Sequence, residues 1–184
     1  MKLIILDRDG VINQDSDSFV KSAEEWIPIE GSIKAIARLY KAGFTVVVAT
    51  NQSGLGRGLF DNHALQAMHK KMHALVEDAG GKIAGVFYCP HHPDDNCECR
   101  KPKAGLINAI EQQLNINAYG AIVIGDSLRD LQAGITKKCV PILVKTGKGQ
   151  ATLKKIVIEQ IADFHNLAVY NNLAAASDAI IKSQ

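Results

Sequence analysis

The stretch Lys2-Leu3-Ile4-Ile5-Leu6-Asp7-Arg8-Asp9-Gly10 decides the fold. Its first half carries four consecutive apolar side chains, which is typical of a parallel strand buried on both faces. The run then ends abruptly in two carboxylates, separated by an arginine and followed by a glycine. In open parallel sheets, ligands bind beyond the carboxyl ends of the strands. The stretch therefore predicts a buried strand that leads straight into a polar site.

The same pattern recurs along the chain, where short apolar runs alternate with longer segments of helical character. The expected strands are residues 2–6, 44–49, 83–88, 121–124, 141–144 and 167–170. The expected helices are residues 31–41, 62–79, 103–114, 128–136 and 174–182. Strands that alternate with helices predict an α/β fold, with a doubly wound parallel sheet between two helical layers. We expect residues 1–184 to form a single three-layer α/β/α domain, because no linker or repeat interrupts the series.

The charge balance is nearly neutral, with 21 lysines and arginines against 19 acidic residues and a formal net charge of +2. A protein that binds nucleic acid or an anionic membrane by charge presents a basic field, which this composition lacks. No apolar run approaches the roughly 18 residues of a membrane span. The N-terminal run is also too short for a signal peptide. We therefore expect a cytoplasmic protein with no nucleic-acid or membrane partner.

Carboxylates gather at the predicted carboxyl ends of two strands. Asp7 and Asp9 point to the same side of an extended chain, and Asp126 follows the fourth predicted strand. Because unpaired carboxylates repel one another, a divalent cation or a shared proton is expected among them. Hard oxygen ligands with space for water and phosphate favour Mg²⁺. A carboxylate can also attack phosphorus, and Thr50 and Lys101 could stabilise the charge of a transferred phosphoryl group.

Three cysteines and two histidines lie close together between residues 89 and 99. Thiolates and imidazole together select Zn²⁺, and four such ligands complete a tetrahedral shell that leaves no place for water. We therefore expect a structural zinc site in this loop. Its predicted ligands are Cys89, His91, Cys97 and Cys99, with His92 as the alternative to His91. Because Lys101 follows directly, the zinc loop is expected to position that lysine.

Four motifs follow one another at the predicted sheet edge: Asp-x-Asp-Gly beginning at Asp7, then Thr50, Lys101 and Gly125-Asp126. In this order they resemble the motifs of the haloacid dehalogenase superfamily of phosphotransferases. The resemblance implies that Asp7 is the nucleophile and that Asp9 is first a general acid and then a base. It also implies that Thr50 and Lys101 hold the phosphoryl oxygens. Asp7, the backbone carbonyl of Asp9 and Asp126 would bind Mg²⁺.

The zinc motif narrows the resemblance within this superfamily. The segment Cys97-Glu-Cys99-Arg-Lys-Pro102 and the segment Ala49-Thr-Asn-Gln-Ser-Gly-Leu-Gly-Arg-Gly58 resemble those of heptose bisphosphate phosphatases. That family implies removal of the C7 phosphate from heptose 1,7-bisphosphate. The remaining 1-phosphate would serve ADP- or GDP-heptose synthesis for lipopolysaccharide or surface glycans. By the same resemblance, the substrate contacts would be Asn51, Gln52, Ser53 and Arg100. A guanidinium also suits phosphate because it can bind two oxygens at once.

Several features leave the details open. Residues 15–19 read Asp-Ser-Asp-Ser-Phe and Ser127 stands where relatives often have lysine, so both depart from the family pattern. Asp130 suits either the Mg²⁺ shell or the start of a helix. No stretch remains for a large cap domain, and this capless type implies a monomer. His69 and His73 lie at helical spacing and are expected on a polar helix face.

Other functions share parts of this pattern. The nearest alternative is a histidinol-phosphate phosphatase of the same superfamily, which also combines the four motifs with a zinc loop. The second phosphate distinguishes the two substrates, because histidinol phosphate carries only one. A phosphatase of 3′-phosphorylated DNA ends is disfavoured by the near-neutral charge. A phospho-acceptor receiver domain would place its aspartate after a middle strand and would have no use for a zinc loop.

Overall fold

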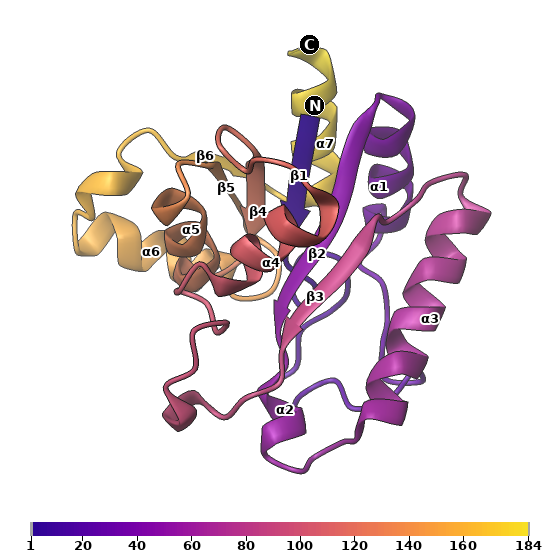
Figure 1. Cartoon of the computed structure of the whole chain (residues 1–184). Helices are drawn as coiled ribbons and strands as arrows, with labels where there is room; N and C mark the ends of the chain where they lie inside the picture. The colour runs from indigo at the N-terminus through magenta and orange to yellow at the C-terminus, as the bar shows by residue number, and fades with distance from the viewer. Residues whose placement is uncertain (1, 184) are drawn as a thin grey trace.

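In the computed structural model, which describes residues 2–183, six strands form one parallel sheet in the order β3-β2-β1-β4-β5-β6 (Figure 1). The strands are β1 (Lys2–Leu6), β2 (Phe44–Asn51), β3 (Gly85–Cys89), β4 (Ile122–Gly125), β5 (Val140–Val144) and β6 (Ala168–Tyr170). The strand order reverses at β1, between β2 and β4. A reversal of this kind opens a crevice at the carboxyl ends of the central strands, where ligands bind. The predicted doubly wound sheet is confirmed.

Seven α-helices occur in residues 2–183, together with two short 3₁₀ turns. The helices are α1 (Ser32–Lys41), α2 (Ser53–Gly56), α3 (Asn62–Asp78), α4 (Gly105–Leu114), α5 (Leu128–Thr136), α6 (Gly149–Ile158) and α7 (Leu173–Lys182). The sequence pattern predicts five of them but does not predict α2 or α6. α2 is a single turn, and neither helix has a side-chain cap at its N-terminus. The start signal on which a sequence prediction relies is therefore absent from both.

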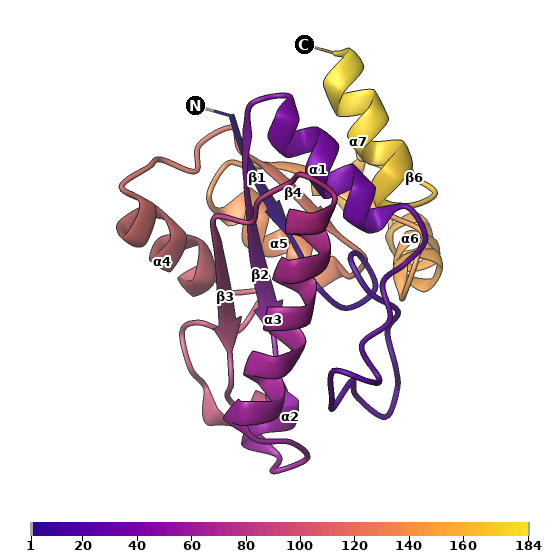
Figure 2. The ribbon, with the colours of Figure 1, turned by 90° about the vertical axis from the view of Figure 1, so that its right-hand side faces the viewer.

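The helices cover both faces of the sheet, and Figure 2 views the face that carries α1, α3 and α7. On that face, Ile4 and Leu6 of β1 pack into a buried cluster with these helices. On the other face, Leu3 and Ile5 pack against α4 and α5, and α6 lies beside α5 in a third cluster. Successive residues of a strand point to opposite faces. Four consecutive apolar residues therefore supply both faces, each contributing roughly 1.5–3 kcal/mol through burial.

The strand register determines which side chains meet at the carboxyl edge. Leu6 pairs with Val48 of β2 and with Ile124 of β4. The chain continues in register for one more residue, because the Asp7 N–H donates to the carbonyl oxygen of Ile124 at 3.0 Å. Asp7 therefore leaves the sheet between the ends of its two neighbouring strands. Figure 1 shows this edge at the opposite end of the molecule from both chain termini.

Loops surround the carboxyl edge within the described residues. Residues 7–31 connect β1 with α1, and residues 90–104 connect β3 with α4. Neither connection contains an α-helix or a strand, and the second contains only the 3₁₀ turn Pro93–Asp95. The expected lack of a large cap domain is confirmed for residues 2–183. In that same range, no helix combines the length and the apolar character that crossing a bilayer requires.

Candidate active site

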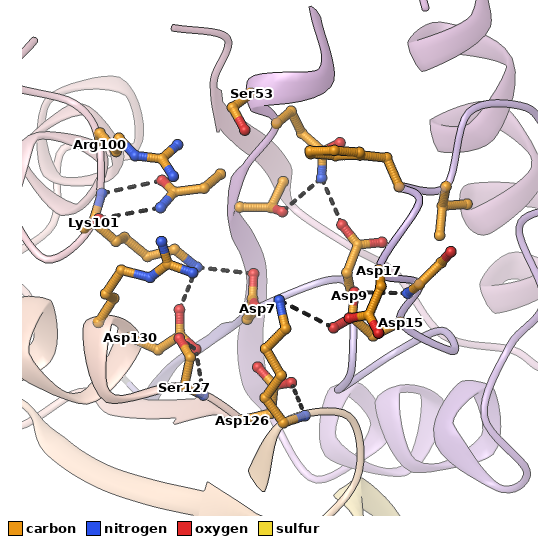
Figure 3. A pocket seen from close by; sticks show the side chains of 18 residues that line it. Asp7, Asp9, Asp15, Asp17, Ser53, Arg100, Lys101, Asp126, Ser127 and Asp130 are labelled. Carbon is orange, nitrogen blue, oxygen red and sulfur yellow. Dashed lines mark hydrogen bonds and ion pairs between the residues drawn. The ribbon is translucent and has the colours of Figure 1, made fainter. Parts of the chain in front are cut away.

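Lys101 lies between two carboxylates at the carboxyl edge of the sheet (Figure 3). Its Nζ donates to Asp7 Oδ1 at 2.8 Å and forms an ion pair with Asp130 Oδ1 at 2.6 Å. A third hydrogen bond joins Nζ to the carbonyl oxygen of Ala49 at 2.7 Å, so all three ammonium hydrogens have acceptors. The lysine is only 6% exposed. Its positive charge is therefore held beside Asp7.

Burial and the neighbouring charges shift the pKa of Asp7, Asp126 and Lys101. Burial raises the pKa of Asp7 to about 6; the charge of Asp130 adds to the shift, and Lys101 opposes it. Burial and the charges of Asp7 and Asp130 raise the pKa of Asp126 to about 8. Burial alone would lower the pKa of Lys101, but the neighbouring carboxylates raise it above its ordinary value. Three carboxylates around one lysine leave an excess of negative charge, which a cation would relieve.

The donor atoms fit a hard divalent cation. Carboxylate oxygens of Asp7, Asp126 and Asp130 lie within 4.8 Å of one another, and Mg²⁺ prefers such ligands. Both oxygens of Asp130 already have partners, since one pairs with Lys101 and the other accepts from the N–H and hydroxyl of Ser127. Asp7 and Asp126 are therefore the better direct ligands, with Asp130 supporting them from behind.

The Asp126 carboxylate is held by backbone from two loops. The Lys148 N–H donates to Asp126 Oδ2 at 2.7 Å. On the other side, Gly10 adopts a φ of 85°, and a Cβ at this position would collide with the Asp126 carboxylate. Only glycine combines this conformation with such a close approach. The hydroxyl of Thr146 then donates to the carbonyl oxygen of Gly10 at 2.6 Å, which ties the two loops together.

Asp9 follows Asp7 by two residues, yet its carboxylate lies in a different environment. Oδ1 accepts a hydrogen bond from Asn13 at 2.8 Å, and Oδ2 accepts one from Gln52 at 2.7 Å. The fully buried guanidinium of Arg8 reaches both oxygens at 3.0 Å. Burial alone would raise the pKa of Asp9, but these three partners outweigh it and lower the pKa below its ordinary value. The Asp9 side chain lies outside the metal-compatible group. The predicted metal ligand of this residue is its backbone carbonyl, and that role stays a prediction.

The four residues from Thr50 to Ser53 have different surroundings. The hydroxyl oxygen of Thr50 accepts from Gln52 Nε2 at 2.9 Å. Asn51 brackets the backbone of Lys101, because its Nδ2 donates to the Lys101 carbonyl at 3.2 Å and its Oδ1 accepts from the Lys101 N–H at 3.1 Å. Ser53 begins α2 and lines the pocket. Two predicted substrate contacts, Asn51 and Gln52, thus bond to other site residues.

The pocket at this edge has a volume of about 190 Å³ and is lined by the metal-compatible carboxylates, by Asp9 and by residues 50–53 at the end of β2 and the start of α2. Arg100 also lines it, and its Nη1 is buried without a hydrogen-bond partner among residues 2–183. Burial, followed by the charge of Arg129, lowers the pKa of Arg100. Lys148 lies on another wall, with its Nζ 3.4 Å from the Asp15 carboxylate. A buried guanidinium nitrogen with no partner suits an anionic group such as phosphate.

Three thiols and an imidazole meet in the loop after β3. The sulfur of Cys97 lies 3.5 Å from that of Cys89 and 3.6 Å from that of Cys99. Nδ1 of His91 lies 3.6 Å from the Cys89 sulfur and 3.2 Å from the Cys99 sulfur. A tetrahedral zinc with Zn–S bonds of about 2.3 Å requires S···S separations of about 3.8 Å and S···N separations of about 3.6 Å. The donor types and their spacing therefore fit Zn²⁺.

His92, the alternative ligand, has a different position. Its Nδ1 accepts from the Asp94 N–H at 3.3 Å, and its own N–H donates to the Asp95 carboxylate at 2.8 Å. These bonds cap the 3₁₀ turn in the middle of the loop. His92 is consequently outside the zinc-compatible group, which contains His91 instead.

The zinc-compatible loop is attached to the active site at both ends. At its start, the carbonyl oxygen of Cys89 accepts from the Gln52 N–H at 2.8 Å, and that of Pro90 accepts from the Gly56 N–H at 2.9 Å. At its end, Cys99 is followed two residues later by Lys101, whose backbone is bracketed by Asn51. These contacts join the loop to the active site, and the role of the zinc loop in positioning Lys101 stays a prediction.

Two residues that the sequence did not single out, Arg8 and Asn13, also shape the site. Both fix the Asp9 carboxylate. Asp130 combines both of its open interpretations in part, since it caps α5 and also pairs with Lys101. The expectation that His69 lies on a polar face is wrong, because the residue is 5% exposed with its Nε2 3.4 Å from Arg8 Nη1. A signal was present, since His69 falls four residues after Leu65 on the apolar face of α3.

Comparison with known proteins reveals similar sequences of known name. A family model described as polynucleotide kinase 3 phosphatase matches residues 2–138. The D-glycero-beta-D-manno-heptose-1,7-bisphosphate 7-phosphatase of Pseudomonas putida is 53% identical over 168 residues, which cover 91% of this chain and 96% of that protein. The protein of the same name from Neisseria meningitidis serogroup B is 52% identical over 187 residues, with coverage of 97% and 100%.

Solved structures agree with these sequences. The crystal structure of D,D-heptose 1,7-bisphosphate phosphatase from B. bronchiseptica, complexed with magnesium and phosphate, superposes with a TM-score of 0.93 at 50% identity. The alignment covers 100% of both chains. The corresponding phosphatase from Burkholderia thailandensis gives a TM-score of 0.73 at 40% identity and covers 98% of this chain and 99% of that one. The likeness therefore extends over the sheet edge and its loops.

Proposed function

This chain belongs to the polynucleotide kinase 3 phosphatase family and, within it, to the heptose 1,7-bisphosphate 7-phosphatases of the haloacid dehalogenase superfamily; we propose that it hydrolyses the C7 phosphate of heptose 1,7-bisphosphate. The reaction passes through an aspartyl-phosphate on Asp7. The products are heptose 1-phosphate and inorganic phosphate. The relatives' names specify the β anomer, and we propose the same preference here. The observation that carries the proposal is Asp7, fixed by Lys101 beside Asp126 in a pocket of about 190 Å³.

In the first step, a carboxylate oxygen of Asp7 forms a bond to phosphorus while the bond from phosphorus to the C7 oxygen breaks. Asp9 donates a proton to the departing oxygen. The Thr50 hydroxyl donates to a phosphoryl oxygen, and Lys101 offsets the negative charge of Asp7 and of the phosphoryl group. A phosphate anion beside Asp9 favours its protonated form, because a nearby like charge raises the pKa of a carboxyl group.

In the second step, a water molecule attacks phosphorus and the Asp7 oxygen leaves. Asp9, now ionised, removes a proton from the attacking water. The Asp7 carboxylate is regenerated and inorganic phosphate departs. One carboxyl group thus serves as the acid in the first step and as the base in the second, which requires its position to stay constant throughout the cycle.

Two metal ions fit the residues present. Asp7 and Asp126 would hold Mg²⁺, together with the backbone carbonyl of Asp9. When bound, the ion neutralises negative charge on the phosphoryl oxygens. Cys89, His91, Cys97 and Cys99 would hold Zn²⁺. Four protein ligands leave no open position, so the zinc role is structural.

Substrate recognition depends on the side chains around the pocket mouth. We propose that Arg100 binds the phosphate that is not transferred, because its buried Nη1 has no partner within residues 2–183. Ser53 lines the same pocket and is proposed to contact the sugar. Asn51 holds the backbone of Lys101, so its predicted substrate contact would have to come from the amide hydrogen that remains.

We also propose that residues 1–184 act as one domain, as a monomer in the cytoplasm, with a small phosphosugar as the partner and neither nucleic acid nor membrane. A single sheet passing through residues 2–170 supports the first point. The formal net charge of +2 supports the absence of a nucleic-acid partner. Gel filtration with light scattering would check the monomer.

The experiment that tests the function is phosphate release with Mg²⁺ from four substrates. They are the β and α anomers of heptose 1,7-bisphosphate, histidinol phosphate, and a DNA oligonucleotide with a 3′-phosphate. We expect the β anomer to have the highest kcat/KM, and phosphorus NMR to show that the 1-phosphate remains. A preference for histidinol phosphate or for the DNA end would replace the proposed substrate. Asp7→Asn, purified in parallel, shows whether a contaminating phosphatase contributes.

A further inference from the structure

The side-chain amide of Gln52 forms hydrogen bonds with three residues of the site. Its Nε2 donates to Asp9 Oδ2 at 2.7 Å and to Thr50 Oγ1 at 2.9 Å, which uses both amide hydrogens. Its Oε1 accepts from Arg8 Nη2 at 3.1 Å. The reverse orientation of the amide would place an oxygen against the Asp9 carboxylate and a nitrogen against a guanidinium. The surrounding charges therefore fix the orientation of the amide. Gln52 is also buried, with 5% of its surface exposed.

This arrangement leaves Gln52 with no hydrogen for a substrate. It also determines what Thr50 can do. Because the Thr50 oxygen accepts from Gln52, its own hydrogen is free to be donated, and a phosphoryl oxygen in the pocket is an acceptor. One amide thus sets the direction of the Thr50 hydroxyl and the position of the Asp9 carboxylate at the same time.

Arg8 supports Gln52 from the interior. Its guanidinium is fully buried and spans both oxygens of Asp9 as well as the oxygen of Gln52. Behind it lies α3, which provides His69 Nε2 at 3.4 Å and the Met68 sulfur at 3.9 Å from Nη1. Burial, with the charges of Arg8 and His73, lowers the pKa of His69 to about 4. The imidazole is therefore neutral at physiological pH and can accept the Arg8 hydrogen.

We propose that Gln52 and Arg8 are positioning residues for the reaction, and that His69 of α3 supports Arg8 from behind. Together they hold the Asp9 carboxylate and the Thr50 hydroxyl in one fixed geometry. This inference rests on the proposed function for the identity of the reaction, but it replaces the predicted substrate contact of Gln52 with an internal role. Among the hydrogen bonds of residues 2–183, Gln52 is the one side chain that bonds to both Asp9 and Thr50.

The inference is tested by comparing two substrates in Gln52 variants. Gln52→Met keeps the side-chain length and removes all three hydrogen bonds, whereas Gln52→Glu keeps the partner for Arg8 but places a carboxylate against Asp9. We expect kcat to fall by about 10²-fold in both variants, with KM changed by less than about threefold, because misplacing a reacting group by about 1 Å costs this much. kcat should fall for p-nitrophenyl phosphate, which has no sugar, as well as for heptose 1,7-bisphosphate, because Asp9 is the base of the second step with either ester.

The matched control is Gln66→Glu, which makes the same chemical change at an exposed position of α3 and is expected to leave both substrates unaffected. Thermal unfolding verifies that each variant is folded. If a Gln52 variant raises KM for the sugar bisphosphate and leaves p-nitrophenyl phosphate hydrolysis intact, Gln52 is a substrate contact and the inference is overturned. Unchanged kinetics with both substrates would overturn it as well.

His69 offers a second test that leaves the pocket wall untouched. His69→Phe removes the acceptor for Arg8, whereas His69→Gln retains one. We expect kcat to fall by about three- to tenfold in the first variant for both substrates, and to be largely restored in the second. Equal kcat values in folded His69→Phe and wild type would remove His69 from the proposal. These comparisons need only p-nitrophenyl phosphate, so they remain decisive if heptose bisphosphate turns out not to be the substrate.

Discussion

Asp7 and Asp9 are the same residue type, two positions apart, yet they lie in two regions with opposite electrostatics. The region of Asp7 contains two further carboxylates and one lysine, and burial with the charge of Asp130 raises its pKa to about 6. The region of Asp9 contains a buried guanidinium and two amide donors, which outweigh burial and lower its pKa. The sequence motif supplies both groups, and the side chains packed around them separate their chemistry.

The two aspartates have different roles because different parts of the fold hold them. Asp7 depends on Lys101, which the loop after β3 and Asn51 hold in place. Asp9 depends on Arg8 and Gln52, which α3 and the end of β2 hold in place. Pairs of carboxyl groups with divergent environments are a general way to run acid and base chemistry in one site. Each support can be altered separately, and the expected effects differ in size and kind.

The largest effect is expected from Asp7→Asn. The amide has no negative charge and cannot form the proposed bond to phosphorus, so kcat should fall by at least about 10⁴-fold with any phosphate ester. Steady-state phosphate release with Mg²⁺ measures it. Activity that survives at a substantial fraction of the wild-type rate would count against Asp7 as the nucleophile, once mass spectrometry has excluded deamidation back to aspartate.

Asp9→Asn tests the acid role of Asp9, because its effect on the first step should depend on the leaving group of the ester. Without the acid, a sugar oxygen leaves poorly, so kcat for heptose bisphosphate should fall by about 10²–10⁴-fold. A nitrophenolate needs no proton, so the first step with p-nitrophenyl phosphate should fall much less. Pre-steady-state release of nitrophenol gives this first step. Equal losses of the first step with both esters would remove Asp9 as the general acid.

Loss of the zinc-compatible site should affect the Asp7 side through Lys101. We expect Cys97→Ser to lower both the melting temperature and the zinc content, and to reduce kcat by about tenfold or more as Lys101 loses its fixed position. Metal analysis, calorimetry and kinetics measure the three quantities. Ser127→Ala, which removes one hydrogen bond to Asp130 and leaves the cysteines intact, is the comparison for a local change beside the same lysine. Full activity in a zinc-free folded protein would contradict the link.

The smallest effect is a pH dependence of stability on the Asp9 side. The pKa of His69 falls from 6.5 to about 4 on folding, so the unfolded chain binds the proton more tightly. The free energy of unfolding therefore keeps its full value above pH 6.5 and decreases as the pH falls toward 4. Relative to pH 7.5, the decrease is about 2 kcal/mol at pH 5. Chemical denaturation at pH 7.5 and pH 5 measures the loss, and His69→Gln should lose less by about that amount. Identical losses would show that His69 is not buried as a neutral group.

Much of the fold could be predicted from the sequence because its signals are local. Apolar runs such as 2–6 report strands that are buried on both faces, and Ser127 with Asp130 reports the start of α5. α6 could not be found in this way, because Gly149 follows Lys148 without a side-chain cap. Its stability comes from contacts such as Ile156 with α5, which no local window contains.

The candidate site shows the same division. The motif residues are recognisable because carboxylates, thiols and imidazole in fixed order have few structural explanations. The residues that support Asp9 from the interior are not recognisable, since Arg8 and His69 are 61 positions apart and meet only after α3 packs against the sheet. Gln52 reads as a substrate contact in the sequence because the partners of an amide are invisible until the neighbouring strands are placed.

The most direct test of the account is to trap the phosphoryl group. Asp9→Asn is mixed with Mg²⁺ and p-nitrophenyl phosphate, quenched in acid within milliseconds to seconds, and digested for mass spectrometry. Because the variant lacks the base for the second step, we predict that a phosphoryl group accumulates on Asp7 to nearly one per chain. The Asp7→Asn protein should show none. Phosphate found on another residue, or nitrophenol released without any phosphorylated protein, would contradict the division of roles between the two aspartates.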